Sequence, residues 1–155
     1  MRHLIELSTA RQMSVGVDLY HQVGALCYRV SRKGRVKVLL VTSRGTGRWI
    51  IPKGWPIEGL TSAQSAAQEA WEEAGVRGEV TPRVLGQFAY KKIRPGKLPL
   101  DCLVDVFALR VEEMAERFPE RGERLRDWLE PEEAARHVSE PDLAALLRSF
   151  APEHQ

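Results

Sequence analysis

Apolar residues along this chain occur in short runs bounded by turn residues, a pattern that is typical of strands. Val23–Val30 ends at a polar turn, and Val36–Thr42 continues the pattern after it. Because the connection is short and contains Gly34, the two runs are predicted to form an antiparallel hairpin. Trp49–Pro52 predicts a further short strand, and its pairing ends at Pro52 because proline has no amide hydrogen.

The middle of the chain predicts one helix, from Ser62 to Ala74. Thr61 and Gln64 have capping-box spacing, and Gly75 is the residue type that commonly ends a helix in the left-handed conformation. With about 3.6 residues per turn, alanines and Trp71 share one face, which is expected to pack closely on a sheet. The opposite face is acidic and is expected to be exposed. It carries Glu69, Glu72 and Glu73.

The second half of the chain predicts two longer strands followed by a helical end. The strands are Val84–Ile93 and Leu100–Val111, joined by a Pro-Gly turn. A short strand is expected over Arg124–Leu129, and helices are expected to begin at Pro131 and near Ser139.

Strands interleaved with one central helix and terminal helices indicate an α/β (α+β) fold, in which a mixed β-sheet is covered on both faces as an α/β/α sandwich. The 155 residues, 43% of them hydrophobic, fit a single domain over residues 1–155. Within it, residues 1–20 show no clean periodicity and are expected to form a loosely docked lead-in segment.

Composition narrows the classes of partner. The formal net charge of +2 is small for sequence-independent nucleic-acid binding, which argues against nucleic acid as a partner. The chain has no apolar run long enough to span a bilayer, so no membrane association is expected. Cys27 and Cys102 lie in apolar, strand-like segments and are expected to be reduced thiols of a cytoplasmic protein, with a disulfide as the alternative if those strands are neighbours.

The acidic helix face suggests a metal site. Its three carboxylates have spacings that destabilise a helix by a few tenths of a kcal/mol, roughly, per like-charged pair. A divalent cation would remove that cost, and closely spaced carboxylate oxygens suit Mg²⁺, with Mn²⁺ as the alternative. A solvated acidic face is the simpler interpretation. The glycine-containing loop from Gly54 to Gly59, directly before the helix, favours the metal site.

The loop and helix together resemble the Nudix box, Gly-x5-Glu-x7-Arg-Glu-U-x-Glu-Glu-x-Gly-U, where U is aliphatic. The matching positions are Gly54, Glu69, Glu72, Glu73, Gly75 and Val76. The resemblance implies a Nudix-type fold and a metal-dependent pyrophosphohydrolase that cleaves a nucleoside diphosphate linked to a group X. It also implies that Glu69 and Glu73 are the principal metal ligands, that Glu72 is a ligand or the general base, and that the Gly54 carbonyl is a further ligand.

Two positions depart from the box. Leu60 stands where the first Glu is expected, and Gln68 stands where the Arg is expected. In the family this Glu is a secondary metal-site carboxylate and the Arg helps to orient the catalytic carboxylates, so a lower rate and a lower metal affinity are expected. Glu58, in the same loop, is a candidate substitute for the missing carboxylate, with an ordinary exposed Glu as the alternative.

Basic and aromatic residues near these segments are candidates for substrate binding. Cationic side chains suit a chain of phosphates, although an ordinary surface charge is the alternative for each one. The basic candidates are Arg44, Arg48, Lys53, Lys91, Lys92 and Arg94. Among the aromatic residues Trp55, Phe88, Tyr90 and Trp128, Trp55 is the one expected to be exposed near a substrate, where it could stack on a nucleobase.

The segment from Trp49 to Pro56 resembles bacterial Nudix proteins of the diphosphoinositol polyphosphate and diadenosine polyphosphate phosphohydrolase type. The resemblance implies a small-molecule substrate with many phosphates. A nucleoside triphosphate or nucleotide-sugar pyrophosphatase is the alternative enzyme. A Nudix-fold module that binds a nucleotide or RNA without turnover is the alternative of another class, favoured by Leu60 and Gln68 and opposed by the three retained glutamates. The protein is expected to be a monomer or a homodimer.

Overall fold

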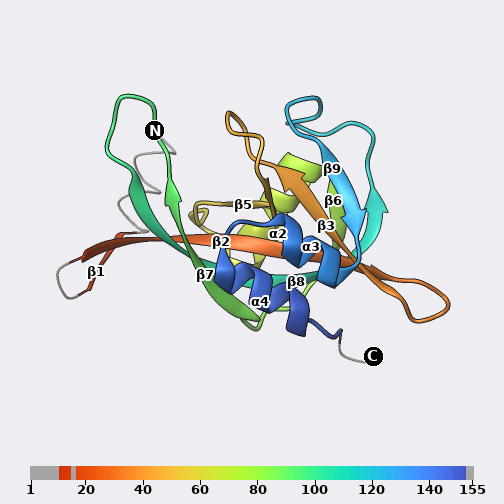
Figure 1. Ribbon diagram of the computed structural model, residues 1–155. Coiled ribbons are helices and arrows are strands. Elements are labelled where there is room, and N and C mark those ends of the chain that lie inside the picture. Colours follow the sequence, from red (N-terminus) through yellow and green to blue (C-terminus); the bar gives the residue numbers. More distant parts are fainter. Residues whose placement is uncertain (1–10, 15–16, 153–155) are drawn as a thin grey trace.

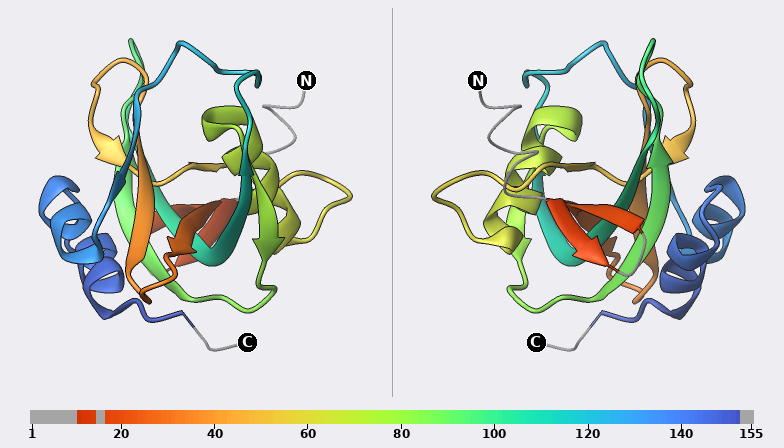
Figure 2. Two further views of the ribbon diagram at one scale, coloured as in Figure 1. Left: turned by 90° about the vertical axis from the view of Figure 1, so that its right-hand side faces the viewer. Right: turned by 90° about the vertical axis from the view of Figure 1, so that its left-hand side faces the viewer.

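A mixed sheet lies between two layers of helix in the computed structural model, which describes residues 11–14 and 17–152 (Figures 1 and 2). The strands are β1 (Arg11–Ser14), β2 (Val17–Val30), β3 (Val36–Thr42), β4 (Trp49–Ile50), β5 (Lys53–Gly54), β6 (Val76–Val80), β7 (Gly86–Lys92), β8 (Leu100–Met114) and β9 (Arg126–Leu129). The helices are α2 (Ser62–Ala74), α3 (Pro131–His137) and α4 (Pro141–Ser149). Helix α2 covers one face, and α3 and α4 cover the other, which confirms the predicted fold class (Figure 2).

The centre of the sheet is the parallel pair β2 and β8, whose register runs from Tyr20 opposite Cys102 to Tyr28 opposite Arg110. The remaining pairings between described strands are antiparallel. These include β2 with β3 and β7 with β8, which are the two pairs of neighbouring strands predicted from the sequence. Parallel central strands are buried on both faces, which explains the nearly continuous apolar runs in both sequences.

The prediction of a loosely docked lead-in segment over residues 1–20 is wrong for part of that range. Residues 1–10, 15 and 16 lie outside the described part of the chain, but 11–14 form β1 and 17–20 begin β2. The mixed polarity of this region hid both strands. β1 pairs with the adjacent start of β2, and from Tyr20 onward β2 also pairs with the distant β8.

Other differences between expectation and structure are local. Of the expected strand Trp49–Pro52, only Trp49–Ile50 forms a strand, β4, and a separate short strand, β5, follows Pro52. The Pro52 carbonyl accepts a hydrogen bond from the Ala25 amide at 2.9 Å. Strand β6 was not predicted, because charged residues and Gly78 interrupt its apolar pattern; it is held at the sheet edge by antiparallel pairing with β8. Strand β9 starts at Arg126, two residues later than expected.

Helix α2 has the predicted bounds and caps. The Thr61 hydroxyl accepts from the Gln64 amide, the Gln64 side chain accepts from the Thr61 amide, and Gly75 takes the left-handed conformation with φ of 69°. Its small residues Ala66, Ala70 and Ala74 are fully buried. The acidic face is not exposed as predicted, because the chain around β5 and the segment before β9 cover it: Glu69 is 7% exposed and Glu73 is 6% exposed.

Both cysteines are buried and free, which confirms the reduced thiols expected from the sequence. Burial raises the pKa of each thiol. None of the described helices is both long enough and apolar enough to cross a bilayer.

Candidate active site

A cavity of about 450 Å³ lies where β5, the acidic face of α2 and the segment before β9 meet. The site therefore combines β5 and α2, which are close in sequence, with a segment about fifty residues further along the chain. The cavity is lined by the four box residues expected to bind metal, which are Gly54, Glu69, Glu72 and Glu73. The helix supplies the glutamates because residues three and four positions apart share a face of an α-helix.

Gly54 lets the chain at β5 approach Glu69 closely. A methyl group added at Gly54 would overlap the carboxylate of Glu69. The backbone at Gly54 does not have a positive φ, so the requirement for glycine comes from this close approach and not from a turn. The carbonyl that the Nudix resemblance assigns to metal binding thus belongs to a residue packed against one of the expected carboxylate ligands.

Glu73 is buried beside a cation. Its Oε2 atom lies 3.8 Å from Nη2 of Arg124. Burial raises the pKa of Glu73 from its ordinary value of 4.5 to about 7, although Arg124 and Lys53 both act to lower it. Burial likewise lowers the pKa of Lys53 to about 8, against the attraction of Glu73.

The residues present fit a divalent cation that completes its shell with water and substrate. Among the residues that the structure describes, no three His, Cys, Asp or Glu side chains already converge as a metal site. Mg²⁺ does not require such a cage, because it is usually held by one or two carboxylates, several waters and substrate phosphates. Glu69 and Glu73 supply two buried carboxylates in the same cavity. A bound cation would offset the cost of keeping them ionised there.

Comparison with known proteins agrees with this geometry. Residues 20–150 match the family model of the NUDIX domain. The chain belongs to the Nudix hydrolase family. It is 34% identical over 133 residues to Nudix hydrolase 16, mitochondrial, of Arabidopsis thaliana, a match that covers 81% of this chain and 72% of that protein.

Other relatives are longer than this Nudix chain. It is 32% identical over 115 residues to diphosphoinositol polyphosphate phosphohydrolase 3-alpha of Mus musculus, and this match covers 73% of this chain and 65% of that protein. It spans about half the length of two further Arabidopsis thaliana relatives, Nudix hydrolases 13 and 12, at 54% and 51%.

Solved structures show the same fold. An Ap4A hydrolase binary complex of C. elegans matches with a TM-score of 0.60 and 23% identity over 83% of this chain and 92% of that chain. A MutT protein from Methanosarcina mazei matches with a TM-score of 0.62 and 19% identity over 87% of this chain and 94% of that chain. At these identities the likeness concerns the fold alone.

The two departures from the Nudix box, Leu60 and Gln68, line one cavity on the flank of α2. Leu60 is 42% exposed, and Trp71 lines the same cavity. Gln68 also donates from Nε2 to Oε2 of Glu72 at 2.9 Å. A neutral amide therefore contacts a box carboxylate from the position where the family has an arginine. Glu58, the candidate substitute carboxylate, is exposed.

We expect the double substitution Leu60→Glu with Gln68→Arg to raise kcat/KM by more than the product of the two single effects. Gln68→Arg alone places a cation beside Glu72, where it competes with metal, and Leu60→Glu supplies a carboxylate to pair with that cation in the shared cavity. A double-mutant cycle at several Mg²⁺ concentrations measures the coupling. Leu60→Gln with Gln68→Arg is the uncharged control, and strictly multiplicative effects would contradict the coupling.

The expected basic residues divide between two adjoining cavities. Arg44, Lys53 and Lys92 line the glutamate cavity and also a second cavity of about 440 Å³. Arg48 and Lys91 line only the second. Each of these two is paired: Arg48 Nη1 lies 2.6 Å from Glu140 Oε2, and Lys91 Nζ lies 2.9 Å from Asp101 Oδ1.

Arg94 and Trp55 are not placed as the sequence suggested. Arg94 lines neither cavity, because its guanidinium donates to the Leu98 carbonyl within the β7–β8 turn, at 2.6 Å from Nη2. Trp55 borders the glutamate cavity but is only 7% exposed, so the expectation of an exposed ring is wrong. It is enclosed because it packs with Leu100 and Cys102 and edge-on against Tyr20.

Sequence reasoning missed several residues that line the glutamate cavity, notably Gln22, Glu120 and Arg124. Gln22 belongs to a partly buried chain of hydrogen bonds in which Lys53 Nζ donates to the Tyr90 hydroxyl at 2.9 Å and that hydroxyl donates to Gln22 Oε1 at 2.5 Å. Glu120 is brought to α2 by its backbone amide, which donates to the Glu72 carbonyl at 2.9 Å. For Glu120 and Arg124 the only sequence signal was a charged stretch that runs into the last predicted strand.

Proposed function

We propose that this Nudix protein hydrolyses a pyrophosphate bond in a small molecule that carries several phosphates. The observation that carries the proposal is the cavity in which Glu69, Glu72 and Glu73 face basic side chains, together with the adjoining basic cavity. The glutamates suit a metal-assisted attack of water at phosphorus, and the second cavity suits further phosphates. Mg²⁺, with Mn²⁺ as a substitute, and a cytoplasmic location belong to the same proposal.

When bound, a divalent cation polarises phosphate oxygens and lowers the pKa of a bound water. The residues of the chain do the rest. Glu69 and Glu73 hold the cation together with the Gly54 carbonyl, and Glu72, oriented by Gln68, acts as a further ligand or as the general base. Lys53, Arg44 and Lys92, which line the same cavity, bind phosphate oxygens.

The aromatic side chains favour a phosphorylated polyol, such as a diphosphoinositol polyphosphate, over a diadenosine polyphosphate. Stacking of a base needs an open aromatic face. Trp55 and Phe88 are buried, Lys53 Nζ lies 4.1 Å from the Tyr90 ring centroid, and the Arg29 guanidinium lies 4.2 Å from that of Trp128. Of the four aromatic residues considered from the sequence, Trp55 and Phe88 are thus enclosed, and Tyr90 and Trp128 are covered on one face by a cation.

Release of phosphate or of a nucleotide from a panel of pyrophosphates tests the function. The panel contains diphosphoinositol polyphosphates, diadenosine tri-, tetra- and pentaphosphate, a nucleoside triphosphate and a nucleotide sugar. Turnover should require Mg²⁺ or Mn²⁺, stop with EDTA and return when metal is added. Binding of a nucleotide or RNA without turnover of any compound would instead support a non-catalytic module.

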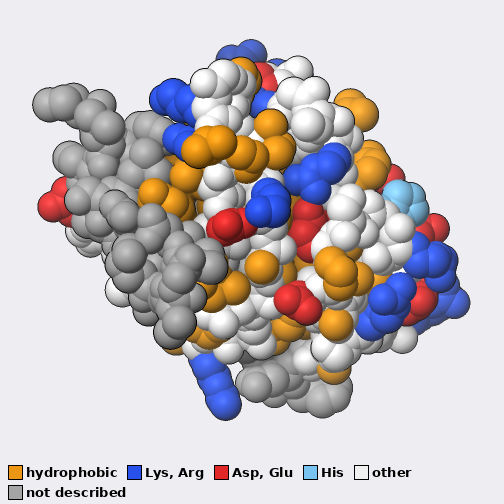
Figure 3. Space-filling model, turned by 60° about the vertical axis from the view of Figure 1, so that its left-hand side comes forward, with side chains coloured by type: hydrophobic (Ala, Val, Ile, Leu, Met, Phe, Trp, Pro, Cys, Tyr) orange, Lys and Arg blue, Asp and Glu red, His pale blue; other side chains and the backbone are white. Residues whose placement is uncertain are grey.

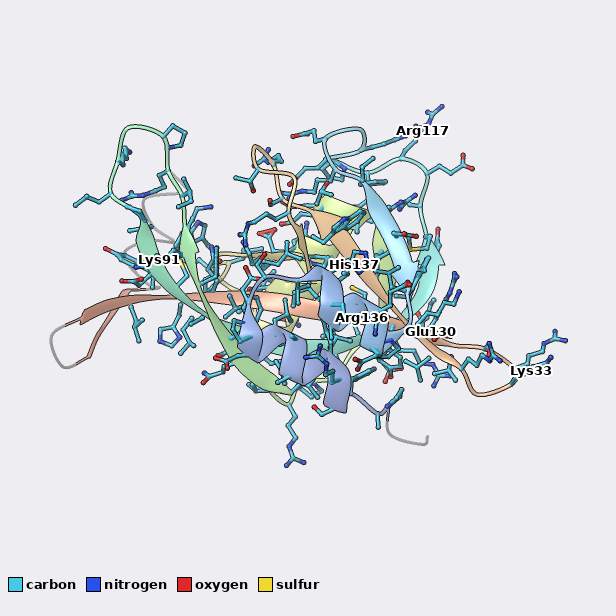
Figure 4. All side chains as sticks on the ribbon, in the orientation of Figure 1. Lys33, Lys91, Arg117, Glu130, Arg136 and His137 are labelled. Atoms are coloured by element: carbon cyan, nitrogen blue, oxygen red, sulfur yellow. The ribbon has the colours of Figure 1, made fainter. Side chains whose placement is uncertain are left out.

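We expect kcat/KM to rise with the number of phosphates, because each one can reach a further cation of the two cavities. Lys92→Ala should weaken this dependence, by about tenfold for the longest substrate, since a charged hydrogen bond contributes roughly 1.5–3 kcal/mol. Lys33→Ala is the matched control. Lys33 lies in the β2–β3 turn, at the opposite end of the molecule from Lys91 on β7 (Figure 4). A preference for a nucleotide sugar that Lys92→Ala leaves unchanged would contradict this prediction.

Nucleic acid is not favoured as the substrate. On the face shown in Figure 3, Lys and Arg side chains lie among Asp and Glu side chains and do not form a continuous basic surface. A mixed surface of this kind lacks the extended positive potential with which proteins follow a phosphate backbone.

A further inference from the structure

Arg124 is a nearly buried cation beside the box carboxylates. Its side chain is 11% exposed, and Nε donates to Glu120 Oε1 at 2.9 Å. Nη1 donates to the Thr42 carbonyl at 3.0 Å, and Nη2 lies 3.8 Å from Glu73 Oε2. Different nitrogens of one planar guanidinium therefore face three separate groups. Burying a cation is costly unless it is paired in this way.

The backbone around Arg124 is fixed on both sides. The next residue, Leu125, exchanges hydrogen bonds with Thr42: its amide donates to the Thr42 hydroxyl at 2.9 Å, and its carbonyl accepts from the Thr42 amide at 3.0 Å. Glu120, the strongest partner of the guanidinium, is itself tied to α2 through the Glu72 carbonyl. Arg124 is thus held between β3 and α2, with its remaining nitrogen directed at Glu73.

This arrangement bears on the missing arginine of the Nudix box. Position 68 is Gln in this chain, and its amide contacts Glu72 without supplying a charge. Arg124 supplies a charge from 56 positions further along the chain and reaches Glu73 instead.

We propose that Arg124 is a positioning residue that holds Glu73 for metal binding and so takes over the task that the Nudix box gives to an arginine at position 68. The proposal rests on the proposed function, since the carboxylate it positions is an expected metal ligand. Two of the three guanidinium nitrogens are bonded to Glu120 and Thr42, so Arg124 acts through Glu73 and not as a phosphate-binding residue.

The test compares Arg124→Gln with Arg126→Gln. Arg126 is a suitable control because it also ties β9 to α2, through the Ala74 carbonyl at 2.5 Å, and lies outside the glutamate cavity. Both variants should lose thermal stability. Only Arg124→Gln should weaken Mn²⁺ binding to the substrate-free protein, measured by electron paramagnetic resonance, and lower kcat by about 10–100-fold, the usual cost of removing a partner of a metal ligand. KM should change little.

Rescue separates positioning from simple structural support. Gln68→Arg should raise kcat/KM in the Arg124→Gln background and not in the otherwise unchanged protein. The Mn²⁺ affinity of Arg124→Lys should lie between that of Arg124→Gln and that of the parent. If Arg124→Gln does not fold, Arg124→Lys decides the Mn²⁺ comparison. Unchanged or tighter Mn²⁺ binding in the Arg124 variants would overturn the proposal. A parent protein that binds Mn²⁺ but hydrolyses no pyrophosphate would overturn the proposed function alone.

Discussion

Glu73→Gln should reduce metal-dependent hydrolysis by about 100-fold or more, because removing even an outer partner of a metal ligand typically costs 10–100-fold and Glu73 is an expected ligand itself. The amide has nearly the same shape as the carboxylate but carries no charge for a divalent cation. The substitution therefore tests the role of Glu73 as a metal ligand and not the packing of α2. Initial rates over a range of Mg²⁺ concentrations measure the loss. Glu79→Gln, at an exposed carboxylate on β6, is the matched control and should retain full activity.

The same variant should not destabilise the metal-free fold. The pKa of Glu73 is raised by burial from 4.5 to about 7, so its ionised form opposes folding progressively as the pH rises through this range. Glutamine removes that opposition, while Arg124 keeps Glu120 as a partner. In EDTA, Glu73→Gln should melt at least as high as the parent at pH 8 and gain relative to it between pH 5 and pH 8. A much lower melting temperature at pH 8 would mean that the pair with Arg124 outweighs the cost of burial.

The parts of the fold that could be predicted from the sequence are those with local causes. The bounds of α2 follow from a capping box at Thr61 and a left-handed glycine at 75, both set by residues within a few positions. The box carboxylates share one cavity for the same reason, since their spacing alone puts them on one helical face. The hairpin of β2 and β3 likewise needs only a short polar turn.

The parts that were missed depend on contacts between distant segments. β6 is a strand because β8 pairs with it, and β2 continues past Tyr20 along β8, which the polarity of these segments does not indicate. Burial of Glu73 depends on the chain near Arg124, about fifty residues away. Helical periodicity identifies the residues that share a face, but it does not reveal that another segment covers that face.

Gly54→Ala should abolish most of the activity at little cost to stability. The added methyl group overlaps the carboxylate end of Glu69, which is flexible and can turn away. The fold therefore tolerates the change, but a principal expected ligand leaves its position, with an expected loss in kcat/KM of about 100-fold, comparable to the larger effects around metal sites. Circular dichroism melts and initial rates on the best pyrophosphate of the panel measure the two effects separately.

Gly59→Ala, in the same loop, should show the opposite result. Gly59 has φ of 88° with nothing within 4 Å of an added methyl group, so alanine there is strained by the backbone alone. It should lose about 1–2 kcal/mol of stability and keep the activity of the folded protein. The double variant Gly54→Ala with Glu69→Ala should be no less active than Glu69→Ala alone, because the methyl group acts by displacing a carboxylate that is then absent. A further loss in the double variant would show that Gly54 serves the site through something other than Glu69, with its own carbonyl as the first candidate.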